Sequence, residues 1–192
     1  MKTSLIKIII LFNGLVLYMS SCKKEEMAVS PPVPGNEFIT TVKIRFQNSG
    51  NANDTTWAIW KDISAGANAP DTSKAIINLK KNSTYKASVY FFDETKTPAI
   101  DLTPEVRERA NYHSYWFFKS GAIANNLTIV ATDYDTNNPP LVLGLLADFT
   151  TTATIGTGRL EGVLKHQPNG KDGTFAPGST DSDVFFTLTI TN

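Results

Sequence analysis

Two histidines are the residues of this chain whose type and place could do chemistry. His113 and His166 are the only histidines among 192 residues, and each lies where an alternating apolar stretch meets a polar connection. Neutral imidazole together with a carboxylate is a ligand set that suits zinc and similar divalent ions. The sequence therefore offers a candidate divalent-metal site made of His113, His166 and Glu105, with three further candidate carboxylates nearby: Asp93, Glu94 and Asp101.

A second interpretation of the histidines needs no metal. At a spacing of two residues His166 continues the apolar face that carries Leu164, and His113 shares a face with Tyr115. An imidazole buried on such a face requires a hydrogen-bond partner. The simpler expectation is that each histidine forms a hydrogen bond to its own backbone partner at the rim of the fold. The alternative, which would give the histidines a function, is that both bind one metal ion.

Other motifs point to binding or packing more than to catalysis. Asp133–Asn137 resembles the opening of a calcium loop, but Asn138 and Gly144 stand where that loop needs glycine and glutamate, so we expect a polar hairpin turn. We find no nucleophile motif and no phosphate-binding glycine loop, and expect no enzyme. Aromatic residues could stack on sugar rings, although core packing is their commoner use in strands: Trp57, Trp60, Tyr90, Trp116 and Phe185.

The first 26 residues carry the most specific pattern in the chain. A short basic segment precedes an apolar run that ends at Ser20-Ser21-Cys22. The run is too short for a bilayer span, which takes about 20 residues. The arrangement resembles the signal peptide and lipobox of bacterial lipoproteins, with Met19 in place of the preferred leucine. The resemblance implies a signal peptide over residues 1–21, cleavage before Cys22, and acylation of Cys22 by palmitate or a similar chain.

A tether follows the cysteine. The charged run Lys23–Glu26 resembles the tethers of surface lipoproteins in the Bacteroidota, and Pro31, Pro32 and Pro34 predict a stiff, extended spacer. Residues 22–36 are therefore the expected tether, and residues 37–192 the expected single folded domain. Acyl chains on Cys22 would hold the protein at the outer membrane, facing the periplasm or the cell surface.

Composition narrows the partners. The chain has 18 basic and 18 acidic side chains, and this balance gives no basic footprint for nucleic acid. Its one cysteine is Cys22. With that thiol acylated, the folded domain has no disulfide and no cysteine-based metal site.

The remaining sequence predicts an all-β domain. Apolar residues alternate in about nine stretches, which is typical of an antiparallel β-sandwich. One short helix is expected over Pro104 to Asn111, with Thr103 as its N-cap and Pro104 in its first turn. Leu79 and Tyr85 are spaced as in the tyrosine corner of Ig-like and fibronectin-like sandwiches, a resemblance that implies a bond from the Tyr85 hydroxyl to upstream backbone.

Two stretches resemble a family of small exported lipoproteins of flavobacteria: Asp93–His113 and Leu164–Pro168. The family has no established activity, and Arg107 and Arg109 stand where its members tend to be acidic. We expect a non-catalytic binding accessory to nutrient or ion uptake, with an outer-membrane protein as its partner. The alternative is a structural or adhesive surface module without a small ligand.

Overall fold

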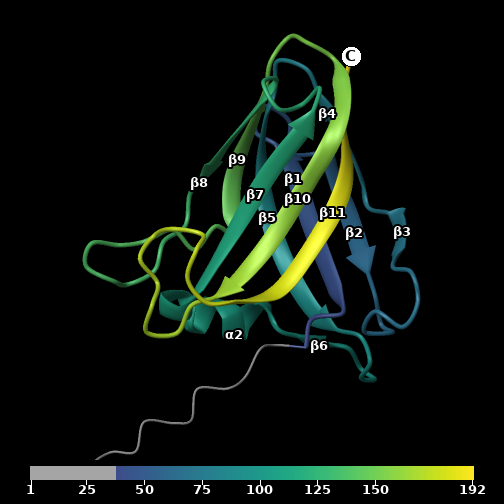
Figure 1. Ribbon diagram of the computed structural model, residues 1–192. Coiled ribbons are helices and arrows are strands. Elements are labelled where there is room, and N and C mark those ends of the chain that lie inside the picture. The colour runs from purple at the N-terminus through teal and green to yellow at the C-terminus, as the bar shows by residue number, and fades with distance from the viewer. Residues whose placement is uncertain (1–37) are drawn as a thin grey trace, which may run out of the picture. The chain divides into compact units, whose positions relative to one another are not determined.

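Two β-sheets packed face to face form the folded part of the protein (Figure 1). The computed structural model describes residues 38–192, which belong to one compact unit, Pro34–Asn192. The predicted all-β sandwich with one short helix is confirmed. The predicted signal peptide at residues 1–21 and tether at residues 22–36 lie outside the described residues, Cys22 included.

The larger sheet has seven strands in the order β3–β2–β1–β5–β9–β8, with β6 beside β5. All of its pairs are antiparallel. In β1 alternation buries Val42, Ile44 and Phe46 completely and leaves Lys43 and Arg45 on the outer face. The strands are β1 (Thr41–Asn48), β2 (Thr55–Lys61), β3 (Asp71–Lys74), β5 (Thr84–Asp93), β6 (Ile100–Asp101), β8 (Leu127–Ala131) and β9 (Leu146–Thr151).

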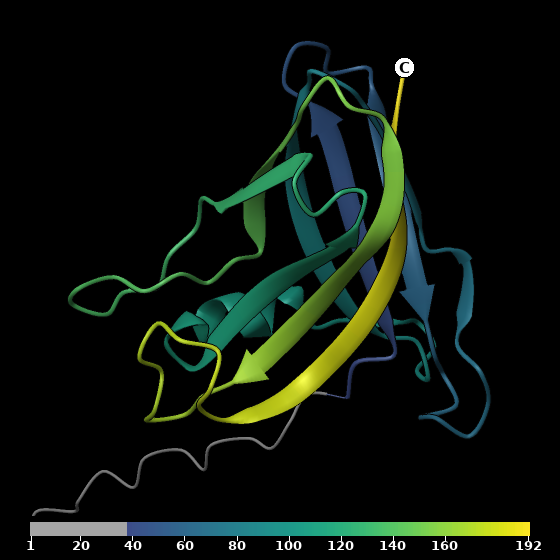
Figure 2. The same ribbon diagram turned by 45° about the horizontal axis from the view of Figure 1, so that its top comes forward.

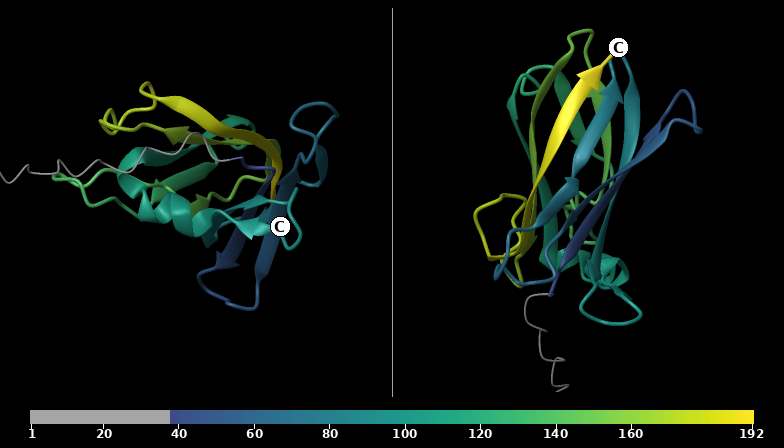
Figure 3. Two further views of the ribbon diagram at one scale, coloured as in Figure 1. Left: turned by 90° about the horizontal axis from the view of Figure 1, so that it is seen from below. Right: turned by 90° about the vertical axis from the view of Figure 1, so that its right-hand side faces the viewer.

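The smaller sheet has four strands in the order β4–β11–β10–β7. These are β4 (Ile76–Lys80), β7 (His113–Gly121), β10 (Gly156–His166) and β11 (Ser179–Thr191). Figure 3 shows β4 beside β11, and this pair is parallel. This pair is the one departure from the antiparallel pairing of the other described strands, because β4 is reached from the other sheet and no hairpin fixes its direction.

The described part of the chain has two strands that the sequence did not predict. Strands β3 and β6 are short, and all of their residues are exposed. An exposed edge strand needs no apolar alternation, so the pattern from which the other strands were inferred is missing there.

The core lies between the sheets and is rich in aromatic rings. Phe46 and Phe149 of the larger sheet meet edge to face at 5.1 Å, and Phe117 of the smaller sheet meets Phe149 at the same distance. Each such side chain contributes roughly 1.5–3 kcal/mol when it is fully buried. This core fixes the two sheets against each other and so fixes the ends of their strands.

Helix α2 (Thr103–Glu108) lies at one end of the sandwich, beside the ends of β7 and β10 (Figures 1 and 2). Val106 anchors it, because this side chain is completely buried in the core. Thr103 does not cap it, contrary to the prediction: its hydroxyl accepts the N–H of Phe91 at 2.9 Å and is thereby held to β5. A 3-10 turn, η1 (Ala110–Tyr112), continues the helix and delivers the chain to His113. Within residues 38–192 no helix has the length and apolar character needed to cross a bilayer.

The loop between β4 and β5 has the contact that a tyrosine corner requires. Tyr85 is 1 % exposed, and its hydroxyl accepts the backbone N–H of Lys80 at 3.1 Å. Leu79 is completely buried beside this turn. The hydroxyl therefore ties the start of β5 to the end of β4, which belong to different sheets.

Tyr85→Phe is expected to lower the free energy of unfolding by about 1–3 kcal/mol, because the N–H of Lys80 loses its acceptor. Urea unfolding measures the effect. Tyr90→Phe is the matched control, since Tyr90 lies half-buried on the outer face of the same strand, and it should change stability by less than about 0.5 kcal/mol. Equal midpoints for Tyr85→Phe and the parent protein would show that the corner contributes nothing.

Candidate metal centre

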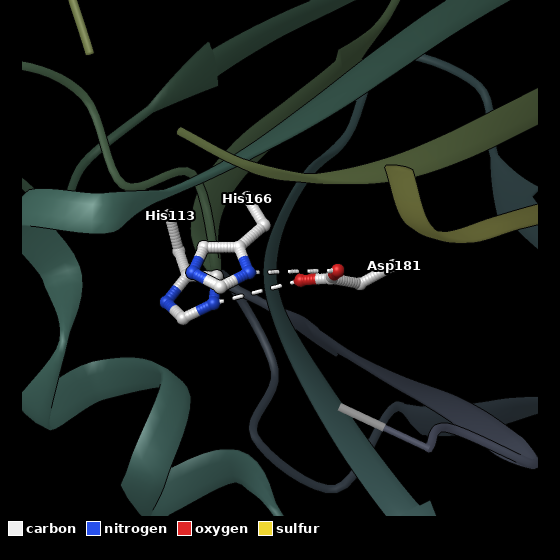
Figure 4. A group of neighbouring side chains, drawn as sticks. All are labelled: His113, His166 and Asp181. Atoms are coloured by element: carbon white, nitrogen blue, oxygen red, sulfur yellow. Dashed lines mark ion pairs between the residues drawn. The ribbon is translucent and has the colours of Figure 1, made fainter. Parts of the chain in front are cut away.

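The two histidines lie directly opposite each other. Strand β7 begins at His113 and β10 ends at His166, and the antiparallel pairing makes these residues partners. Their rings stack with centroids 4.9 Å apart and planes inclined by 25°. The two histidines thus meet at one end of the sandwich, beside the short helix (Figure 4).

A carboxylate from a third strand joins the two rings. In Asp181 of β11, Oδ2 lies 3.6 Å from Nε2 of His113, and Oδ1 lies 3.9 Å from Nδ1 of His166 (Figure 4). One ligand atom from each residue can be chosen so that all three lie within 4.8 Å of one another. We call these residues the His-His-Asp cluster.

Asp181 reaches the cluster because of a β-bulge. The pairing of β10 with β11 shifts between Leu164 and Lys165: Leu164 lies opposite Ser182, and Lys165 opposite Thr180. Asp181 is thus the extra residue, and a bulge re-aims the side chain at such a position. Regular alternation would place Asp181 on the outer face with Asp183, so the sequence pattern could not reveal it.

Glu105, the predicted carboxylate ligand, is engaged elsewhere. Its side chain is 41 % exposed and pairs with Arg109 at 2.9 Å, one helical turn away. The other candidates also have partners of their own: Asp93 accepts the N–H of Thr95, and Glu94 pairs with Lys43. Asp101 accepts the N–H of Thr103. Asp181 therefore replaces Glu105 in the candidate site.

Burial makes the cluster electrostatically demanding. The exposed fractions of the His113, His166 and Asp181 side chains are 0 %, 4 % and 0 %. A carboxylate removed from water is strongly destabilised unless positive charge or hydrogen-bond donors compensate it. The groups that compensate the charge of Asp181 therefore affect the free energy of folding.

The backbone fixes the proton on His113. Nδ1 of His113 lies 3.1 Å from the carbonyl oxygen of Arg109. A carbonyl oxygen only accepts, so Nδ1 carries the hydrogen, and in the neutral ring Nε2 presents a lone pair. That lone pair faces the Asp181 carboxylate. A second proton on the ring, or a cation between the two groups, would make this arrangement favourable.

His166 presents its two nitrogens to different surroundings. Nδ1 faces Asp181, whereas Nε2 is buried and has no hydrogen-bond partner within residues 38–192. The polar side of this ring is thus the side that faces the cluster. A metal ion held there would receive the lone pair of Nδ1.

The two nitrogen–oxygen separations are close to what one small metal ion requires, and the three ligand atoms lie within 4.8 Å of one another. Two ligand atoms bound to one tetrahedral zinc ion lie about 3.4 Å apart, given bonds of about 2.0–2.1 Å. The two nitrogen–oxygen distances of 3.6 and 3.9 Å are slightly wider. A hydrogen-bond from the second ring nitrogen to a backbone carbonyl, as in His113, is the usual support of a metal-bound histidine.

The connection between β10 and β11, residues 167–178, is fastened around the cluster. The backbone N–H of Gln167 donates to the carbonyl of Tyr112 at 2.6 Å. Its side-chain amide donates to the carbonyl of Thr174 at 2.9 Å, and its oxygen accepts the hydroxyl of Ser114 at 3.0 Å. These bonds hold the connection to the segment that precedes and follows His113.

The polar hairpin turn expected at Asp133–Asn137 is confirmed as the first part of a hairpin over residues 133–141, and its carboxylates make hydrogen bonds within it. Tyr134 bridges to Val142. Asp133 accepts the N–H of Gly144, and Asp135 accepts the N–H of Leu141, both at 2.8 Å. The carboxylates therefore support the turn, as expected for a polar hairpin.

Of the five aromatic residues considered for sugar stacking, Trp60 packs against the core. The other four lie on the outer faces: Trp57 and Tyr90 in contact at 5.6 Å, Trp116 with Phe175 at 6.0 Å, and Phe185 beneath the guanidinium of Arg159 at 3.3 Å. Core packing, the commoner use, thus holds for Trp60, and sugar binding at the outer faces stays a prediction.

Comparison with known protein families, with curated proteins and with solved structures finds no match to this chain. The resemblance to flavobacterial lipoproteins therefore stays a prediction.

Proposed function

We propose that this chain is a lipid-anchored cell-envelope protein whose β-sandwich binds one divalent transition-metal ion, with zinc as the best fit. The observation that carries the proposal is the fixed tautomer of His113. Its N–H is committed to the carbonyl of Arg109, and the opposite lone pair faces the carboxylate of Asp181. A divalent cation between them accepts that lone pair and compensates the buried charge.

The ligand set favours zinc among the common metals. Imidazole nitrogen and carboxylate oxygen are ordinary zinc ligands, and zinc tolerates irregular geometry because its d shell is full. Calcium and magnesium prefer oxygen ligands alone. Copper binds such sites tightly as well, so it is expected to compete with zinc for this site.

The enclosure of the site favours binding over catalysis. Catalytic metal sites keep one position open for water or substrate, whereas structural sites are closed. All three side chains are at most 4 % exposed, so a substrate in solvent would not reach the ion. This supports a binding accessory to ion uptake or a metal-stabilised module, and does not favour a hydrolase.

Metal content is the experiment that tests the proposal. The purified protein, dialysed against zinc and then buffer, is expected to retain about one zinc ion per chain. Asp181→Asn should lose most of it, because the carboxylate charge is gone. Asp183→Asn, two residues along the same strand and exposed, is the matched control and should retain it. Equal zinc content in the two variants would contradict the proposal.

A structural or adhesive module is the second candidate. Phe118 and Phe175 are 40 % and 38 % exposed on the outer face of the smaller sheet, and their rings meet at 5.2 Å. Exposed aromatic pairs are common where proteins contact partners. A protein that takes up no metal, and keeps its stability when Asp181 is replaced by Asn, would favour this function.

Membrane attachment gives a separate prediction. Cys22→Ala is expected to move the protein from the membrane fraction to the soluble fraction, because two or three acyl chains supply most of the membrane affinity. Labelling of cells with palmitate, followed by fractionation, measures both effects. A Cys22→Ala protein that still incorporates palmitate and still sediments with membranes would contradict the anchor.

A further inference from the structure

The cluster is closed by a connection that contains a buried ion pair. Nζ of Lys171 lies 2.8 Å from Oδ2 of Asp135, and these side chains are 2 % and 0 % exposed. The same ammonium donates to the carbonyl oxygen of Ala110 at 2.9 Å. A single side chain thus joins the 167–178 connection to the 133–141 hairpin and to η1.

Asp135 is itself held in place by backbone donors. Asp135 accepts the N–H groups of Asn137 and Leu141 at 3.0 and 2.8 Å. Burial alone would raise the pKa of Asp135, but Lys171 and the backbone donors outweigh it and hold that pKa below its ordinary value. The Lys171–Asp135 ion pair therefore joins the 167–178 connection to the 133–141 hairpin.

Lys171 lies between His166 and Asp181 in the sequence, two of the three proposed ligands. The connection leaves the cluster at His166 and returns to it three residues before Asp181. The second partner of Lys171, Ala110, precedes His113 by one short turn. Figures 1 and 2 show this connection beside α2 at the end of the sandwich. Movement of the connection would therefore displace Asp181 relative to both rings.

We propose that the Lys171–Asp135 pair is a latch that holds the 167–178 connection closed over the metal and so sets the rate of metal exchange. This inference rests on the proposed function. An enclosed ion leaves only when its ligands separate, and the connection is the shortest segment whose movement separates Asp181 from His166. Local opening of this kind is governed by the contacts that close the segment.

The test is the rate at which zinc passes from the loaded protein to excess EDTA. Lys171→Met and Asp135→Asn are each expected to release zinc at least about tenfold faster than the parent, since tenfold corresponds to a change of only about 1.4 kcal/mol. Both should still bind about one zinc ion per chain. Lys86→Met is the control, because its ammonium pairs with Asp148 at 3.5 Å on an exposed face.

Removing one partner of a buried pair can prevent folding. The double variant Asp135→Asn/Lys171→Gln, which is neutral and can still form a hydrogen bond, therefore carries the same test and should also release zinc faster. Release as slow as in the parent overturns the latch while leaving the metal site intact. A parent protein that takes up no zinc overturns both proposals.

Discussion

Zinc is expected to raise the melting temperature of the purified protein by about 5–10 °C when its free concentration is about 100 times the dissociation constant. A ligand that binds only the folded state stabilises it by about 2.7 kcal/mol at that concentration. For a chain of this length each kcal/mol shifts the melting temperature by about 2–4 °C. The reference is the same protein in excess chelator.

The histidine variants give this prediction its specificity. His113→Ala and His166→Ala should each abolish the zinc-dependent shift, and the double variant should add nothing to that loss, because one ion needs both rings. Asp183→Asn should keep the full shift. Two variants that each lose part of the shift independently would indicate separate roles for the histidines and no shared ion.

Replacing Gly178 with alanine is expected to have the second large effect. Gly178 has φ +77°, and a Cβ there would lie 2.0 Å from the carbonyl oxygen of His166. This carbonyl is part of the backbone of His166, so it cannot rotate away from the new methyl group as a flexible side chain could. We expect a loss of about 3–5 kcal/mol in the free energy of unfolding, the range of severe single substitutions, together with weaker zinc binding.

Gly66 separates the two causes of that loss. It has a similar φ of +84°, but a Cβ there would meet nothing within 4 Å. Gly66→Ala should therefore cost only the backbone term of about 1–2 kcal/mol and leave zinc binding unchanged. Urea unfolding and zinc titration of both variants make the comparison, and equal losses would show that contact with His166 is unimportant.

The approach of the two histidines could be predicted, whereas their third partner could not. His113 starts one strand and His166 ends another, and the rings share the apolar faces of those strands. Antiparallel pairing then brings such positions together. Asp181 points toward the histidines only because of a bulge in β11. The alternation of apolar and polar residues in that strand, which buries Val184, does not reveal the bulge. One extra residue in a strand changes which face a side chain occupies.

The same limit explains the errors in the fold. Thr103 has the residue type of an N-cap, but tertiary contact with Phe91 uses its hydroxyl. Strand β4 alternates between exposed and buried residues, yet its parallel pairing with β11 depends on how the chain crosses between sheets. Periodicity reports which face is buried and says little about neighbours in the sheet.

X-ray absorption at the zinc edge of the loaded protein tests the central claim most directly. We expect two imidazole nitrogens and at least one oxygen at about 2.0–2.1 Å, with the two-imidazole signal lost in His113→Ala, which retains only the His166 ring. Added copper should displace the zinc and retain the two imidazoles. A zinc ion surrounded by oxygen alone, or a two-imidazole signal that persists in His113→Ala, would contradict a metal centre at His113, His166 and Asp181.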